Sequence, residues 1–119
     1  MKKLLIIFFI NIFAVNSAYS AEEVLTSLKE GGKIIFIRHA LAPGNGDPEN
    51  FDLNDCSTQR NLNQRGIEQS KFIGNIFNKN QIKIENVYSS EWCRCIDTAK
   101  FAFQNYETFS ALNSFYDIR

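Results

Sequence analysis

The sequence predicts an α/β fold with three layers, α/β/α, built on a mostly parallel sheet. Residues 33–37, KIIFI, form a nearly continuous apolar run, which is typical of a strand covered on both faces. A second short strand is expected at residues 84–88, and a segment with helical spacing separates the two at residues 64–79. A strand–helix–strand order of this kind implies a parallel pair with a right-handed crossover.

The first two helices are predicted from the residues at their ends. Residues 22–30 predict a short helix, which Gly31 and Gly32 would stop. Asn63 suits the N-cap of the helix at 64–79, because its side chain can accept a hydrogen bond from the first turn. The expected buried face of that helix has helical spacing and consists of Gly66, Gln69 or Ser70, Ile73, Ile76 and Phe77.

The remaining segments predict a long loop, a third helix and the start of a further strand. Residues 40–61 hold both prolines together with Gly, Asn and Asp, and therefore predict a loop. Ser89 and Ser90 are expected to cap a helix over residues 91–103. Residues 106–119 are weakly patterned and could begin another strand. The third helix would bury Ile96, Ala99 and Phe103.

Residues 1–20 have the form of a secretory signal peptide. Two lysines precede an apolar run at residues 4–15, and small residues follow at Ala18 and Ser20. We therefore expect cleavage near Ser20 or Ala21 and a periplasmic or secreted protein. An uncleaved membrane anchor is the alternative, but the run is shorter than the ~20 apolar residues of a spanning helix. No stable membrane anchoring is expected after cleavage.

The charge balance excludes a protein that binds nucleic acid through bulk positive charge. The whole chain has 13 basic and 13 acidic residues, and without the two lysines of the signal peptide 11 basic residues remain against 13 acidic ones. A mature chain with a small net negative charge does not attract a polyanion. No nucleic-acid partner is expected.

Two of the three cysteines could form a disulfide if the protein is exported, because an oxidising compartment permits one. Cys56 could pair with Cys93 or with Cys95, leaving one free thiol. Cys93 and Cys95 are not expected to pair with each other, since side chains two residues apart on a helix point in different directions. A C-x-C pair with one distant cysteine and no suitably spaced histidine matches zinc-ligand spacing poorly. No metal is expected.

Arginine follows both expected strands. Arg38 and His39 follow the first expected strand directly, and Arg94 comes shortly after the second expected strand. Ligands of parallel α/β sheets bind beyond the carboxyl ends of the strands, so these segments are expected to converge. Arg60 and Arg65 lie in the connecting segments. Because the guanidinium fork binds phosphate through two hydrogen bonds, this edge predicts an anion site.

His39 is the one histidine of the chain and the candidate nucleophile. A neutral imidazole at a strand end can attack phosphorus and form a phosphohistidine, which divides one difficult displacement into two easier ones. Nearby guanidinium groups would stabilise the charge on the transferred group. The alternative is a histidine whose hydrogen bonds are simply satisfied at the end of a strand.

Three motifs give the chain a family resemblance. Residues 34–40, IIFIRHA, resemble the strand and R-H-G motif of the histidine phosphatase superfamily, with Ala40 in place of Gly. Residues 61–70, NLNQRGIEQS, are similar to its L-[ST]-x-x-G-x-x-Q-A segment. Residues 87–99, VYSSEWCRCIDTA, are similar to its V-x-[ST]-S-x-x-x-R-[AC]-x-[EQ]-T-A segment. The resemblance covers residues 33–119, and the loop resembles an exported bacterial branch.

The resemblance implies a role for each residue of the expected site. His39 would accept the phosphoryl group from a small phosphorylated substrate, and Arg38 and Arg94 would clamp the phosphate. Arg60 could reach the same pocket, whereas Arg65 falls at a variable position and is expected on the surface. Because the arginines supply the positive charge, no cofactor is implied.

The resemblance also implies a second histidine late in the domain, which this chain lacks. Residues 21–119 are therefore expected to be the N-terminal part of a histidine phosphatase-like domain, incomplete at the C-terminus. A longer protein would be a phosphoric monoester hydrolase, and this chain its incomplete front part. The alternative is a non-catalytic anion-binding or interaction module of the same fold. The general acid stays open among Glu107, Asp117 and the loop acids Asp47, Glu49, Asp52 and Asp55.

Overall fold

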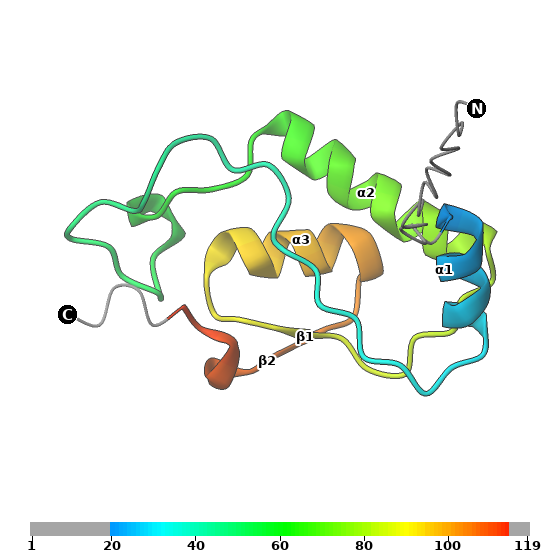
Figure 1. The fold of residues 1–119 in the computed structure, drawn as a ribbon. Coiled ribbons are helices and arrows are strands. Elements are labelled where there is room, and N and C mark those ends of the chain that lie inside the picture. The colour runs from blue at the N-terminus through cyan, green and yellow to red at the C-terminus, as the bar shows by residue number, and fades with distance from the viewer. Residues whose placement is uncertain (1–19, 115–119) are drawn as a thin grey trace, which may run out of the picture.

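A computed structural model of the protein describes residues 20–114; the predicted signal peptide, apart from Ser20, lies outside this range. The described part is an α/β unit with three α-helices, two short 3₁₀-helices and a two-stranded parallel sheet (Figure 1). The predicted α/β class is confirmed and the sheet is parallel as predicted, but it pairs residues 88–89 with residues 107–108 and not the predicted strands at 33–37 and 84–88. The elements are α1 (Ala21–Lys29), a 3₁₀-helix (Cys56–Thr58), α2 (Gln64–Lys79), β1 (Tyr88–Ser89), α3 (Cys93–Phe103), β2 (Glu107–Thr108) and a second 3₁₀-helix (Ser110–Leu112).

Helix α3 connects β1 to β2, and α2 packs on α3 (Figure 1). In the sheet Tyr88 pairs with Glu107 and Ser89 with Thr108, both in parallel register. The α2–α3 interface brings the two backbones close together, because a Cβ atom at Gly74 would collide with the carbonyl oxygen of Ala102.

Helix α2 begins and ends where the sequence predicts, and α1 lies one residue earlier at both ends than predicted. In α1, Ser20 and Glu23 form a capping box. In α2, the Asn63 side chain accepts a hydrogen bond of 2.9 Å from the Gly66 backbone N–H. The buried residues of α2 are Gly66, Ser70, Gly74 and Phe77, so the predicted stripe faces the core, with Ile73 and Ile76 half-buried at its sides.

Helix α3 begins later than predicted, and the predicted serine cap is wrong. Ser89 lies in β1, where its hydroxyl donates to the carbonyl of Ser90, and the buried Ser90 hydroxyl has no partner in the described chain. Trp92 is the N-cap residue and makes no side-chain capping bond. The first N–H of the helix, that of Cys93, instead donates to the Gln59 side chain at 2.9 Å. A distant loop residue has therefore replaced the local cap.

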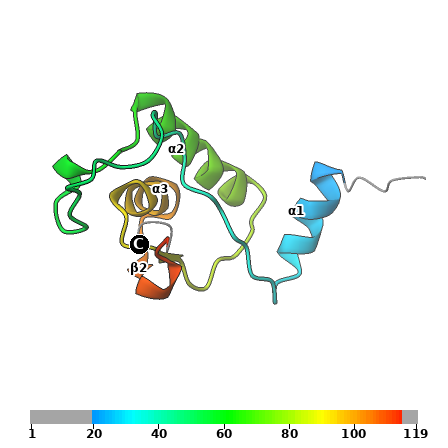
Figure 2. The same cartoon turned by 60° about the vertical axis from the view of Figure 1, so that its left-hand side comes forward.

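The predicted buried strand at residues 33–37 is also wrong for the described chain. The segment is extended but pairs with neither β1 nor β2, and Ile34 and Phe36 are each 85% exposed. Figure 2 shows it passing from α1 towards α2 apart from β2. Packing starts only at Ala40 and Leu41, whose backbone N–H groups donate to side chains of α3 and α2. With strands of two residues each, the described sheet offers no edge long enough to pair with this run.

The loop at residues 40–61 is a loop in the structure, as predicted, and contains only one short 3₁₀-helix. Gly66 at the start of α2 packs directly against it, because a Cβ atom there would collide with the carbonyl oxygen of Leu41. The buried position expected for Gly66 is therefore confirmed. Across residues 20–114, no helix is long and apolar enough to cross a membrane.

Candidate phosphate site

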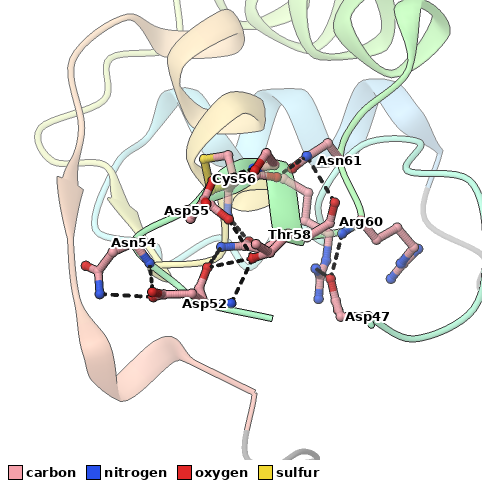
Figure 3. The surroundings of a disulfide bond; sticks show 12 residues. Asp47, Asp52, Asn54, Asp55, Cys56, Thr58, Arg60 and Asn61 are labelled. Carbon is pink, nitrogen blue, oxygen red and sulfur yellow. Dashed lines mark hydrogen bonds and ion pairs between the residues drawn. A yellow bond between two sulfur atoms is a disulfide. The ribbon is translucent and has the colours of Figure 1, made fainter. Parts of the chain in front are cut away.

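Three contacts fasten the loop at residues 40–61 to the start of α3 (Figure 3). A disulfide joins Cys56 to Cys93, with the two Cα atoms 5.7 Å apart. The Gln59 side chain binds the backbone N–H of Cys93, and the Asp47 carboxylate binds Arg94. This is one of the two pairings of Cys56 that the sequence left open. Cys95 is a half-buried free thiol.

Short hydrogen bonds also give the loop a defined shape around the disulfide (Figure 3). The Asp55 carboxylate accepts from the backbone N–H and the hydroxyl of Ser57, at 3.0 and 2.7 Å. These bonds stabilise the ionised carboxylate and hold the pKa of Asp55 below its usual value. The Asp52 carbonyl accepts from the Gln59 side chain at 2.8 Å, which orients Gln59 for its bond to α3.

Arg94 is the most enclosed of the predicted site residues, with 7% of its surface exposed. Its Nη1 donates to Asp47 Oδ1 at 3.0 Å, and its Cζ lies 4.5 Å from the centre of the Trp92 ring. Its Nε is buried and has no hydrogen-bond partner within residues 20–114. A buried guanidinium needs a partner for its charge, and Asp47 provides one.

Arg60 is held in a similar way by the same loop. Its Nη1 donates to the carbonyl oxygens of Ala42 and Gly44, at 2.6 and 3.2 Å. Its backbone N–H donates to Asp47 at 2.8 Å, as Figure 3 shows. The Nε of Arg60, like that of Arg94, is buried without a partner in the described chain. The loop therefore orients two guanidinium groups, each through Nη1.

His39 is half-buried and lies within range of the charges of these arginines. Its Nδ1 is 2.7 Å from the Ala40 carbonyl oxygen. Because a carbonyl can only accept, Nδ1 carries the proton and Nε2 keeps its lone pair. Burial lowers the pKa of His39 below its ordinary value, and the charges of Arg94, Arg60 and Arg38 lower it further, whereas the Ala40 carbonyl partly opposes them.

The structure thus brings His39 within the electrostatic reach of all three predicted arginines. Arg38 is exposed beside His39, and Arg65 is exposed at the start of α2. Of the acids considered for proton transfer, Glu107 lies exposed in β2 and Asp117 lies outside the described residues. Asp47 is the loop acid that contacts the site.

Three residues of the site have roles in the structure that were not predicted from the sequence, where Asp47 was considered only as an acid. Asp47 holds Arg94, Gln59 caps α3, and Thr98 receives the backbone N–H of Ala40. Only Thr98 had a usable signal, since it lies one turn after Arg94 on the same helix. Within residues 20–114, no group of three or more metal-ligating side chains could hold a metal ion.

A histidine whose pKa is lowered by burial and by the charges of three arginines, on a parallel α/β unit, is an arrangement suited to binding phosphate groups. The family model of the histidine phosphatase superfamily (branch 1) matches residues 34–112, and the chain belongs to this superfamily. Members of the superfamily in general transfer phosphoryl groups through a phosphohistidine. Comparisons with curated proteins and with solved structures find no match.

Proposed function

We propose that the protein is a phosphatase that moves the phosphoryl group of a small phosphate monoester to His39 and then to water. The observation that carries the proposal is the state of His39. Its Nδ1–H is bound to the Ala40 carbonyl, and burial together with three arginines favours the neutral ring. Nε2 is therefore the free lone pair that an in-line attack on phosphorus requires.

The reaction has two balanced steps. First, Nε2 of His39 attacks phosphorus, an N–P bond forms, the ester P–O bond breaks, and the leaving oxygen takes up a proton from solvent. Then water attacks the phosphorus of the phosphohistidine and the N–P bond breaks. Inorganic phosphate leaves, the proton lost by water passes to solvent, and His39 is again neutral. The Ala40 carbonyl keeps its hydrogen bond to Nδ1 throughout and fixes the orientation of the ring.

The arginines stabilise the charge on the transferred group. Arg38 and Arg94 clamp the phosphate oxygens, and Arg60 contributes from the loop. Support comes from the unpaired, buried Nε atoms of Arg60 and Arg94, which are donors without an acceptor in the described chain. Buried donors normally have acceptors, so a phosphate oxygen is a suitable partner for each.

We also propose that the protein is exported and that its fold has the three-layer α/β/α architecture. The Cys56–Cys93 disulfide supports export, since disulfides persist in oxidising compartments. The exposed apolar side chains of Ile34 and Phe36 support a further layer over residues 33–37. Sequencing the mature N-terminus tests the export proposal, with a first residue near Ala21 expected and retention of Met1 contradicting it.

Phosphohistidine trapping tests the chemistry. The protein is incubated with a ³²P-labelled phosphate monoester, quenched, and assayed for label that is stable to alkali and labile to acid. We expect label on the wild type and on Arg65→Gln, and none on His39→Ala. Turnover that is unchanged in His39→Ala, or a wild type that turns over substrate without label, would refute the phosphohistidine route.

A second candidate function is a non-catalytic phosphate-binding module of the same fold. The observation that favours it is that the described residues place one histidine near the arginines, whereas the family resemblance implies two in the pocket. Such a protein would bind inorganic phosphate and release none from esters. Calorimetric phosphate binding without turnover on several monoesters would select this function over the first.

A further inference from the structure

Asp47 connects the two arginines of the loop and α3 through one oxygen atom. Its Oδ1 accepts from Arg94 Nη1 at 3.0 Å and from the Arg60 backbone N–H at 2.8 Å. Only 3% of the Asp47 side chain is exposed. Asp47 is therefore a buried acid in a site of positive charge.

The geometry of the two guanidinium groups gives this acid a specific role. In both arginines Nη1 is bound by oxygens of the segment at residues 42–47, and Nε is buried without a partner in the described chain. Binding a guanidinium at one nitrogen fixes its plane and leaves the Nε side unpaired. That side can form the paired hydrogen bonds with which arginine holds a phosphate.

We propose that Asp47 is a positioning residue of the phosphate site. It holds Arg94 and the backbone of Arg60 so that the Nε sides of their guanidinium groups are available to the substrate phosphate. Asp47 itself acts through Arg94 and does not touch the substrate. This inference rests on the proposed function, since it requires that the arginines bind phosphate.

If Asp47 instead competed with phosphate for Arg94, the opposite change in phosphate affinity would be expected. If Asp47 only occupied Arg94 until a phosphate displaced it, removing the carboxylate would free a positive charge and strengthen phosphate binding. If Asp47 positions Arg94, removing it weakens binding even though a negative charge has left the site. The sign of the change in affinity therefore separates positioning from competition.

The experiment compares Asp47→Ala and Asp47→Asn with the wild type. The readouts are the Kd for inorganic phosphate by calorimetry, and KM and kcat for p-nitrophenyl phosphate. For Asp47→Ala we expect Kd and KM to rise by about tenfold or more, as when a charge-assisted hydrogen bond is lost. Asp47→Asn keeps an accepting oxygen, so its values should lie between those of the alanine variant and the wild type.

Two controls exclude effects of charge and of folding. Glu85→Gln removes a negative charge at an exposed position outside the site and should leave Kd and KM unchanged. Circular dichroism at the assay temperature establishes that each variant is folded, and the conservative Asp47→Asn variant carries the test if Asp47→Ala does not fold.

A double-mutant cycle tests whether Asp47 acts through Arg94. In an Arg94→Gln background, replacing Asp47 should change Kd and KM less than it does in the wild type, because only its contact with the Arg60 backbone is left to lose. Tighter or unchanged phosphate binding in folded Asp47 variants overturns the inference, as does a full additive loss in the double mutant. A wild type that neither binds phosphate nor turns over esters would instead overturn the proposed function, and this inference with it.

Discussion

Ala40 donates its backbone N–H to the hydroxyl of Thr98, 58 residues later in the chain, at 2.9 Å. The same hydroxyl donates to the Arg94 carbonyl at 2.7 Å, and both bonds are buried. Ala40 follows His39 directly, and Arg94 lies one turn before Thr98 on α3. One hydroxyl group therefore fixes the backbone beside the candidate nucleophile against the helix that carries the candidate clamp.

Replacing Thr98 by Val should destabilise the protein and displace His39 from Arg94. The variant keeps the shape of the side chain but leaves the buried Ala40 N–H without an acceptor, which costs about 1–3 kcal/mol of unfolding free energy. Urea denaturation measures this change. Thr98→Ser retains the hydroxyl and is the matched control, so equal unfolding midpoints for the Val and Ser variants would contradict the prediction.

Gly66→Ala should destabilise the protein through a steric clash with the loop. The added Cβ would collide with the backbone of Leu41, so α2 and the segment after His39 must move apart. Overpacking of this kind costs roughly 1–3 kcal/mol, outweighing the better helix propensity of alanine. Thermal unfolding measures the loss. Asn75→Ala, exposed on the same helix, should change stability by no more than about 0.5 kcal/mol, and an equal loss there would contradict the steric reason.

Local sequence signals were sufficient to predict the first two helices. Asn63 caps α2 with its own side chain, and the buried face of α2 follows the 3.6-residue period. A parallel sheet was predicted from the order of the elements, because a helix between two strands favours a crossover, but the observed pair joins β1 and β2 across α3 and not the two predicted strands. These features depend on residues close together in the chain.

The predictions that were wrong, and the contacts that were not predicted, depend on segments that are distant in the chain. The apolar run containing Ile34 and Phe36 predicts a buried strand, but burial requires a neighbouring strand, and the described sheet provides none beside it. Gln59 capping α3 and Asp47 binding Arg94 arise from the path of a long loop, for which no periodic pattern exists. The expected strand order placed the arginines near one edge of the sheet, but no sequence pattern predicted the residues that hold them there.

Reducing the Cys56–Cys93 disulfide should lower stability and weaken the phosphate site together. The bond closes a sequence separation of 37 residues, and loss of such a cross-link typically costs about 3 kcal/mol. It also fastens the loop that carries Asp47 and Arg60 to the first turn of α3. Cys56→Ser should therefore unfold at lower denaturant concentration and bind phosphate less tightly than the wild type.

Cys95→Ser is the matched control for the disulfide, because Cys95 is a free thiol on the same helix. Its stability and phosphate affinity should match those of the wild type, and both proteins should be weakened by dithiothreitol. A Cys56→Ser variant that unfolds like the wild type under oxidising conditions would show that the cross-link does not stabilise the loop.

The last prediction concerns the protonation of His39, which as the one histidine of the chain gives a single imidazole NMR signal. Burial and the neighbouring arginines lower its pKa in the folded protein, so its titration midpoint should lie below the ordinary value of about 6.5. Because the unfolded chain then binds a proton more readily, His39 contributes stability that is present above pH ~6.5 and lost as the pH falls through the folded-state pKa. The fall should be absent in His39→Ala. Arg38→Gln should raise the midpoint because it removes one positive charge, whereas replacing the exposed Arg65 by Gln should not. A wild-type midpoint at or above about 6.5 would contradict the neutral ring on which the proposed chemistry depends.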